Sequence, residues 1–91
     1  MQKIWKYEIP LSEKFKIDMP RGMEIVKIDA IDGTPYMWVL FWDHNESNVV
    51  EYEFALAPTG GDIGDDYIYA GTFIIGAVVF HLLEFHDDIP F

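Results

Sequence analysis

Three histidines are the side chains best suited to acid–base chemistry, since imidazole ordinarily titrates near neutral pH. They are His44, His81 and His86. His81 stands in the apolar run 78–83, where a histidine is predicted to be a hydrogen-bonded core residue rather than a ligand or a base. Ser12 and Ser47 lack the context of a nucleophile motif such as G-x-S-x-G, and the sequence has no cysteine. We therefore predict no catalytic residues and a protein that is not an enzyme.

Carboxylates gather in a glycine-rich loop, which raises calcium binding as a hypothesis. This loop contains Asp62, Asp65 and Asp66 among Gly60, Gly61 and Gly64. It lacks the D-x-D-x-D-G order and the distal glutamate of a calcium loop, so a solvated turn is the default interpretation. A second weak metal hypothesis is His86-Asp87-Asp88, for which a frayed terminus is the better interpretation. The sequence thus predicts no metal and no cofactor.

A ligand with a phosphate needs cations or convergent N–H donors, and the sequence offers few of either. Arg21 is the only guanidinium and precedes Gly22, where backbone can approach a ligand closely. Lys3 and Lys6 flank Trp5, so a base stacked on the indole would have a cation nearby. The hypothetical binding set joins these residues to backbone donors of a neighbouring subunit. It comprises Arg21, Lys3, Trp5, Lys6, Thr59 and Gly60. The alternative is that Arg21 pairs with a carboxylate and that the rings belong to the core.

Charge is distributed unevenly along the chain. All six Lys and Arg residues lie in the first 27 positions, which also hold four acids and sum to +2. The remaining residues hold twelve acids and sum to −12. Such a surface disfavours binding to nucleic-acid polymers, because phosphate neutralisation requires a basic face. Solubility is the plain interpretation, and head-to-tail attraction between subunits or mimicry of a nucleic acid are the sharper ones.

The sequence pattern predicts that the elements positioning these residues are β-strands. Residues 36–42 form an apolar run of seven, four of them aromatic, between a turn signal and a polar break. A run this short is typical of a strand covered on both faces. Period-2 alternation or apolar character predicts six further strands, at residues 3–9, 14–19, 23–31, 50–56, 67–75 and 77–85. The last of these also fits a helix, although its β-branched and aromatic content favours a strand.

Turn residues separate the predicted strands. Pro20-Arg21-Gly22 and Asp32-Gly33 are turn signals, and Thr34-Pro35 extends the second into a predicted loop of about four residues, 32–35. The glycine-rich stretch 58–66 is predicted to be irregular. The whole chain, residues 1–91, is predicted to be one all-β domain, an antiparallel sandwich or barrel of about seven strands.

Size and composition bear on the oligomeric state and the cellular location to be expected. Hydrophobic residues make up 51% of only 91 residues, more than so small a core can bury, so we expect a homo-oligomer. The longest candidate for a membrane span, residues 73–83, is too short and is interrupted by Gly76 and His81. The first residues do not resemble a signal peptide. We therefore expect no membrane association and an intracellular location.

Four segments carry a resemblance that spans nearly the whole chain. They are residues 4–10 (IWKYEIP), 19–22 (MPRG), 69–73 (YAGTF) and 79–84 (VFHLLE). In order and spacing they resemble a family of roughly 90-residue proteins of unknown function found mainly in tailed phages and prophages. The resemblance implies a phage accessory protein that acts in the cytoplasm of the bacterial host, with no catalytic residues.

Two classes of function follow from that resemblance and from the missing nucleophile. In the first, a non-enzymatic anti-defence protein binds and neutralises a host factor, either by sequestering a small signalling nucleotide at a subunit interface or by inhibiting a host protein directly. An acidic nucleic-acid mimic is a variant of this class. In the second, the protein is a structural or assembly component without a ligand.

Overall fold

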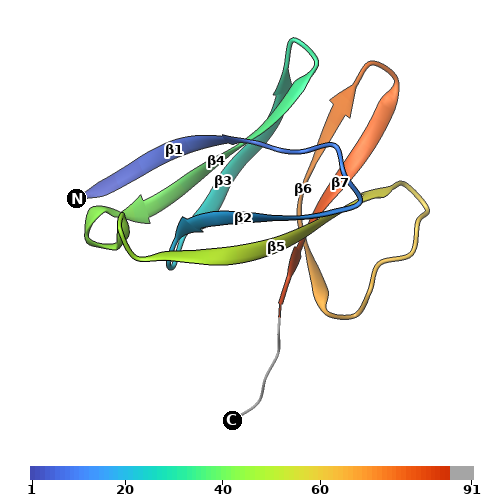
Figure 1. The fold of residues 1–91 in the computed structure, drawn as a ribbon. Coiled ribbons are helices and arrows are strands. Elements are labelled where there is room, and N and C mark those ends of the chain that lie inside the picture. The colour runs from blue at the N-terminus through green and yellow to red at the C-terminus, as the bar shows by residue number, and fades with distance from the viewer. Residues whose placement is uncertain (87–91) are drawn as a thin grey trace.

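The computed structural model describes residues 1–86, and its strands are joined by short connections except for one long loop, residues 59–66 (Figure 1). Seven strands and one short 3-10 helix, η1, are formed. Their bounds are β1 Gln2–Glu8, β2 Lys14–Pro20, β3 Glu24–Ile31, β4 Thr34–Trp42, η1 Asp43–Asn45, β5 Val49–Pro58, β6 Tyr67–Ile75 and β7 Val78–Phe85. The predicted all-β fold of about seven strands is confirmed, and the last segment is a strand rather than a helix. Within residues 1–86, no helix is long and apolar enough to cross a membrane.

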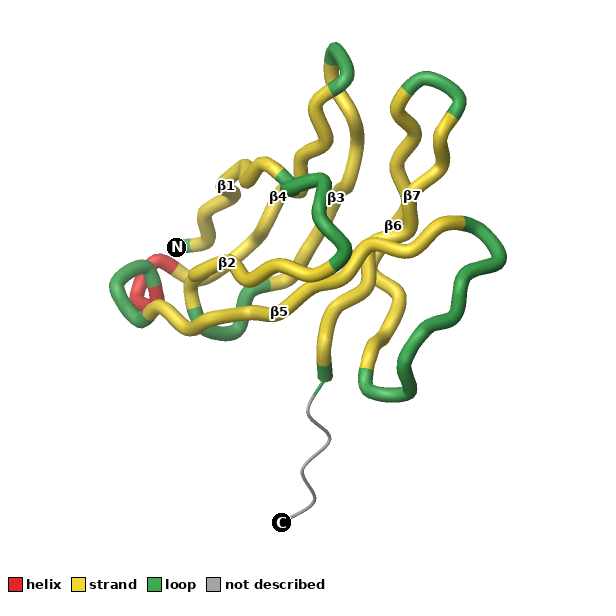
Figure 2. The backbone as a smooth tube through the Cα atoms, turned by 45° about the vertical axis from the view of Figure 1, so that its right-hand side comes forward, coloured by secondary structure: helices red, strands yellow, loops and turns green. Residues whose placement is uncertain are grey.

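The strands form two antiparallel sheets. The three-stranded sheet has the order β1-β4-β3, and the four-stranded sheet has the order β2-β5-β7-β6. Figure 2 shows the segment between β1 and β2 passing from one sheet to the other. Ile9, in this segment, is 1% exposed, and its N–H donates to the carbonyl oxygen of Pro35 at 2.9 Å. The connection is thereby fixed to both the core and the sheet that it leaves.

The central strand β4 explains how the core is filled. Its side chains alternate across the pleat, so Met37, Val39 and Phe41 are buried on the inner face. They meet inward-facing residues of the other sheet, among them Phe54, Phe73 and Leu82, which are 0–3% exposed. The opposite face of β4 carries half-buried aromatic and aliphatic side chains and the exposed Trp42. β4 therefore has two apolar faces, as the sequence indicates, and residues 1–86 fully bury only the inner one.

The hairpin between β3 and β4 is tighter than the sequence predicts. Asp32 and Gly33 both have positive φ, 51° and 80°, which is the conformation of a two-residue hairpin turn whose twist matches that of the strands. Thr34 and Pro35 belong to β4 and pair with Ile31 and Ala30, so the predicted four-residue loop is wrong.

The sandwich closes where β3 and β6, the edge strands of the two sheets, approach each other. Each has a bulge, between Ile25 and Lys27 in β3 and between Tyr69 and Gly71 in β6. A Cβ at Gly71 would overlap the Cδ1 of Ile28 and lie 3.3 Å from its Cβ. Only glycine therefore allows β6 to come this close to β3.

Candidate functional site

Four polar side chains form a continuous hydrogen-bonded chain on the outer face of the four-stranded sheet. The Thr59 hydroxyl lies 2.8 Å from Nε2 of His81, and the Thr72 hydroxyl lies 2.9 Å from its Nδ1. The Tyr69 hydroxyl lies 2.7 Å from Oγ1 of Thr72. We call Thr59, His81, Thr72 and Tyr69 the hydroxyl–imidazole chain. It confirms the prediction that His81 is hydrogen-bonded, although the residue is half-buried at a sheet face and not in the core.

Strand register brings these residues together. Thr72 pairs directly with His81 across β6 and β7, and Ala57 pairs with His81 across β5 and β7. Thr59 follows the end of β5 in a turn, closed by the bond from Gly61 N–H to the Pro58 carbonyl at 3.0 Å. That turn carries the Thr59 hydroxyl back to the imidazole.

The bulge in β6 brings Tyr69 to the same face. Tyr69 and Thr72 are three residues apart, so in a regular strand their side chains would point to opposite faces. Because the bulge inserts a residue at Ala70, Tyr69 pairs with Leu83 and Thr72 with His81, and both lie on one face. Sequence reasoning missed Tyr69 and Thr72 because nothing in the alternation signals the bulge.

The hydrogens of this chain can be counted. Three hydroxyls and a neutral imidazole hold four exchangeable hydrogens, and the three internal bonds use three of them. One O–H is therefore left to donate outward, at Thr59 in one tautomer and at Tyr69 or Thr72 in the other. A protonated imidazole would donate to both threonines and leave two outward donors. The chain can thus donate to an external acceptor, and its hydroxyl oxygens can also accept.

A shallow groove beside the hydroxyl–imidazole chain is partly covered by the glycine-rich loop. Its volume is about 250 Å³. The floor contains Ala55, Ala57 and Leu83, each at most 8% exposed, and Ile63 from the loop lies at its edge. At its rim, the Tyr67 hydroxyl donates to Oε2 of Glu53 at 2.6 Å, and this bond is the main reason that the pKa of Tyr67 rises to about 12.

The sequence-predicted set is divided between the two ends of β5. Thr59 and Gly60 follow its last residue, and Thr59 belongs to the hydroxyl–imidazole chain. Arg21 lies at the other end, where its N–H donates to the carbonyl of Asn48 at 2.9 Å. Ten residues of strand separate these positions, roughly 30 Å. Within residues 1–86, the Arg21 guanidinium forms no ion pair, so its predicted pairing with a carboxylate is not found there.

The three predicted residues of β1 do not form one site either. Lys3 is bound to the Glu46 carboxylate, and this hydrogen bond raises the pKa of the lysine. Trp5 packs edge-on against Phe41 with ring centroids 4.6 Å apart. Lys6 points to the opposite face of the sheet, where its Nζ lies 4.5 Å from the centroid of the Tyr36 ring. The strand pleat therefore separates Lys6 from the indole that it was predicted to accompany.

The acidic loop forms an exposed turn. Asp62, Asp65 and Asp66 are exposed, and no group of three or more metal-ligating side chains is found in residues 1–86. His86 lies 3.7 Å from the Glu84 carboxylate, and its proposed partners Asp87 and Asp88 lie outside the described residues. The prediction that the protein needs no metal or cofactor stays a prediction.

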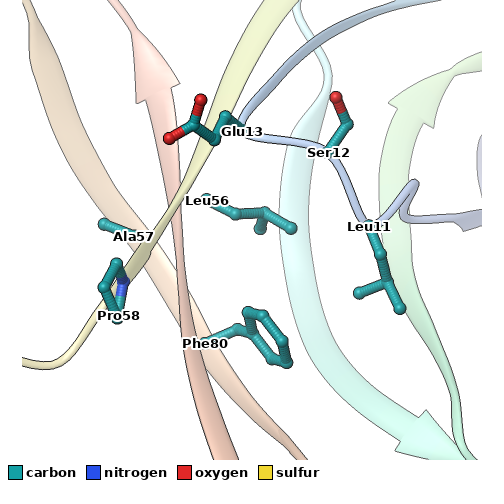
Figure 3. A pocket seen from close by; sticks show the side chains of 7 residues that line it. All are labelled: Leu11, Ser12, Glu13, Leu56, Ala57, Pro58 and Phe80. Carbon is teal, nitrogen blue, oxygen red and sulfur yellow. The ribbon is translucent and has the colours of Figure 1, made fainter.

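A larger apolar cavity, about 410 Å³, opens at the rim between the sheets (Figure 3). Figure 3 shows the side chains of Leu56 and Phe80 directed toward Leu11 of the β1–β2 connection. The polar lining is limited to Ser12 and Glu13, and the Glu13 carbonyl already accepts the N–H of Leu56 at 3.0 Å. The cavity has little with which to orient a polar ligand.

Comparison with known proteins identifies one family. The model of a family described as Domain of unknown function (DUF7352) matches residues 1–89. No curated protein and no solved structure matches the chain.

Proposed function

We propose that this chain, which belongs to the DUF7352 family of domains of unknown function, is a non-enzymatic binding protein that holds a small nucleotide by its phosphate. The observation that carries the proposal is the hydroxyl–imidazole chain, which links four side chains from three segments through bonds of 2.7–2.9 Å. It ends outward in hydroxyl groups, and a phosphate oxygen is an acceptor for such donors.

Two neighbouring features fit the same ligand. Gly60 follows Thr59 with φ of 85°, and within residues 1–86 its N–H donates no hydrogen bond, so this amide is available to an anion. Tyr69 is 64% exposed, and an exposed ring next to a phosphate site is suited to stacking a base. Thr59 and Gly60 were predicted as ligand residues from the sequence, and the proposal adds Tyr69, Thr72 and His81.

Binding is favoured over catalysis by the group that orients the imidazole. Thr59 and His81 are spaced as a nucleophile and a base would be. The partner of Nδ1, however, is the Thr72 hydroxyl, which lacks the charge by which a carboxylate stabilises an imidazolium. We therefore propose that the pair recognises a ligand and does not cleave one.

The proposed biological role follows from the resemblance to phage proteins. A phage-encoded protein of this kind would act in the cytoplasm of the infected bacterium by sequestering a host signalling nucleotide. A second candidate is direct inhibition of a host protein or mimicry of a nucleic acid, favoured by the −12 sum of charges after residue 27.

Calorimetric titration with cyclic and ADP-ribose-type nucleotides tests the proposal. We expect at least one to bind with a dissociation constant below roughly 10 μM, about −7 kcal/mol. Thr59→Val removes an outward hydroxyl and should weaken that binding roughly tenfold or more, because a lost hydrogen bond to a charged group costs about 1.5–3 kcal/mol. Thr72→Val and His81→Gln should also weaken it, because each interrupts the hydrogen bonds that orient the outward hydroxyls. Thr34→Val is the matched control, since it removes a hydroxyl that lies on the other sheet.

The outcomes separate the function from its site. If no nucleotide binds, sequestration is rejected and the protein-inhibitor candidate takes its place. If a nucleotide binds equally well to Thr72→Val and His81→Gln, the function stands and the site is wrong. Arg21→Ala tests the hypothesis that a neighbouring subunit supplies the cation, because only a site shared between chains would lose affinity.

A further inference from the structure

The outer face of the three-stranded sheet is a second organised surface, independent of the hydroxyl–imidazole chain. Its centre is β4, whose outward side chains are Tyr36, Trp38, Leu40 and Trp42. Neighbouring strands add charged residues in register. We call the two central cross-strand rows the acidic row, Glu8–Tyr36–Asp29, and the lysine row, Lys6–Trp38–Lys27.

Each row has the same design, an aromatic ring in the middle and like charges at both ends. The lysine side chains lean over the rings, with Lys6 Nζ 4.5 Å from the Tyr36 centroid and Lys27 Nζ 5.3 Å from that of Trp38. Beyond the lysine row, Ile4 is 57% exposed and Trp42 is 49% exposed. An apolar patch rimmed by charged residues is typical of an interaction surface.

We propose that two copies of this chain pack face to face through this surface, related by a two-fold axis that crosses the strands between the acidic and lysine rows. The operation sets each lysine row against the acidic row of the other copy. Lys6 then opposes Glu8 of the partner subunit, Lys27 opposes Asp29 of the partner subunit, and Trp38 lies over Tyr36 of the partner subunit. The two β4 strands run antiparallel, as in an aligned sandwich of sheets about 10 Å apart.

Charge selects this axis from the two that an aligned face-to-face dimer allows. A two-fold axis parallel to β4 would place lysine row on lysine row and acidic row on acidic row. Like charges that face each other in an interface cost several kcal/mol. The axis across the strands instead sets every terminal charge of both rows against an opposite charge of the partner subunit, so the surface is complementary to itself. Lys27 and Asp29, whose Nζ and Oδ2 lie 3.9 Å apart within one chain, would then form a four-charge cluster with the same pair of the other copy.

The same charges favour a second copy over a nucleic acid. A stretched strand of bases stacked on Tyr36 and Trp38 would bring its phosphates to Glu8 and Asp29 as well as to the lysines. Glu24, in the next row at Leu40, adds another acid on this face. The acidic residues of this face therefore repel a nucleic acid, whereas they attract the lysine row of a second copy.

Sedimentation equilibrium of the full chain tests the dimer. We expect a mass of twice the 10.6 kDa of one chain at micromolar concentration. Trp38→Ala should raise the dissociation constant at least tenfold, while Ile74→Ala, at an exposed apolar residue on the other sheet, should leave it unchanged. A monomeric wild-type protein overturns the proposal and leaves the surface to a different kind of partner.

Charge reversal tests the register. Lys6→Glu/Lys27→Glu makes both rows acidic, and Glu8→Lys/Asp29→Lys makes both rows basic, so each double variant alone should be monomeric. Mixed in equal amounts, the two should form a dimer, because each acidic row then meets a basic one. Lys14→Glu/Lys16→Glu, on the four-stranded sheet, is the control for charge alone. Failure of the mixture to associate, or dimerisation of either variant by itself, overturns the proposed pairing.

Discussion

At the scale of single residues, the bond between Tyr67 and Glu53 predicts a loss of stability at alkaline pH. The carboxylate accepts the phenol hydrogen and raises the pKa of Tyr67 from its usual 10.0 to about 12. The folded state therefore holds this proton more tightly than the unfolded state does. The stabilisation is complete below about pH 10 and is lost as the pH rises toward about 12.

The measurement is the free energy of unfolding in urea between pH 8 and 12, for the wild type and for Tyr67→Phe. The wild type should lose more stability than the variant over the upper part of this range, and the two curves should converge. Tyr69→Phe serves as the control, since the Tyr69 phenol bonds a neutral hydroxyl. Parallel curves for wild type and Tyr67→Phe would show that Glu53 does not hold the proton.

The candidate site shows how far single residues can be predicted from sequence. Thr59 and Gly60 were predicted as ligand residues because a Thr-Gly-Gly turn offers donors, whereas His81 was predicted to be a hydrogen-bonded core residue and not a ligand. Thr72 and Tyr69 were not, because their common face depends on the bulge after Tyr69. The grouping of Lys6 with Trp5 failed because sequence neighbours in a strand point to opposite faces.

At the scale of elements, the approach of β3 to β6 predicts that Gly71→Ala is destabilising. The added methyl group overlaps the Cδ1 of Ile28, so the two edge strands must separate or Ile28 must leave its rotamer. Overpacking of this kind costs about 1–3 kcal/mol. Urea unfolding monitored by tryptophan fluorescence measures the change.

A double-mutant cycle identifies the cause. Ile28→Val removes the overlapping Cδ1, so Gly71→Ala should cost less in the Ile28→Val background than in the wild type. Gly64→Ala is the matched control, because its Cβ would meet Tyr67 at an ordinary 3.5 Å. Equal costs of Gly71→Ala in both backgrounds would mean that the contact with Ile28 is not the reason.

The elements themselves could be predicted because their alternation is strong. Met19 and Phe54 fall on the inner faces that the period-2 patterns indicate. The local backbone geometry was not predicted correctly. The Asp32-Gly33 turn takes two residues, both with positive φ, as an Asp-Gly pair favours. The error was to count Thr34 and Pro35, which begin β4, as part of the loop. The alternation of apolar residues shows which face of a strand is buried but not which strands pair. The pairing of β1 with β4 and of β2 with β5 could therefore not be predicted from it.

At the scale of the whole molecule, the two proposed surfaces lie on opposite sides of the sandwich. The hydroxyl–imidazole chain is on the outer face of the four-stranded sheet, and the acidic and lysine rows are on the outer face of the three-stranded sheet. A dimer formed through the rows would therefore leave the proposed nucleotide site of each copy open. We therefore expect each chain to bind one nucleotide. The Lys6→Glu/Lys27→Glu monomer should bind it with the same affinity as the wild-type dimer.

The last prediction concerns the net charge of −10 on a chain with a radius of gyration of 13.6 Å. Charges repel across the whole molecule in 10 mM salt, where the screening length is about 30 Å, and much less in 0.2 M salt, where it is below about 10 Å. The ion pairs that salt also weakens are exposed, such as Lys16–Glu51 with side chains 58% and 60% exposed. Such pairs contribute about 0–1 kcal/mol each.

Repulsion therefore outweighs attraction, and the melting temperature should rise between 10 mM and 0.2 M NaCl. Asp62→Asn/Asp65→Asn/Asp66→Asn removes three exposed charges from one turn, so it should melt higher than wild type in 10 mM salt and respond less to added salt. Melting curves at several protein concentrations separate this effect from dissociation of a dimer, which alone depends on concentration. A melting temperature that falls with salt would show that the ion pairs, and not the excess of acids, dominate the electrostatic free energy of this fold.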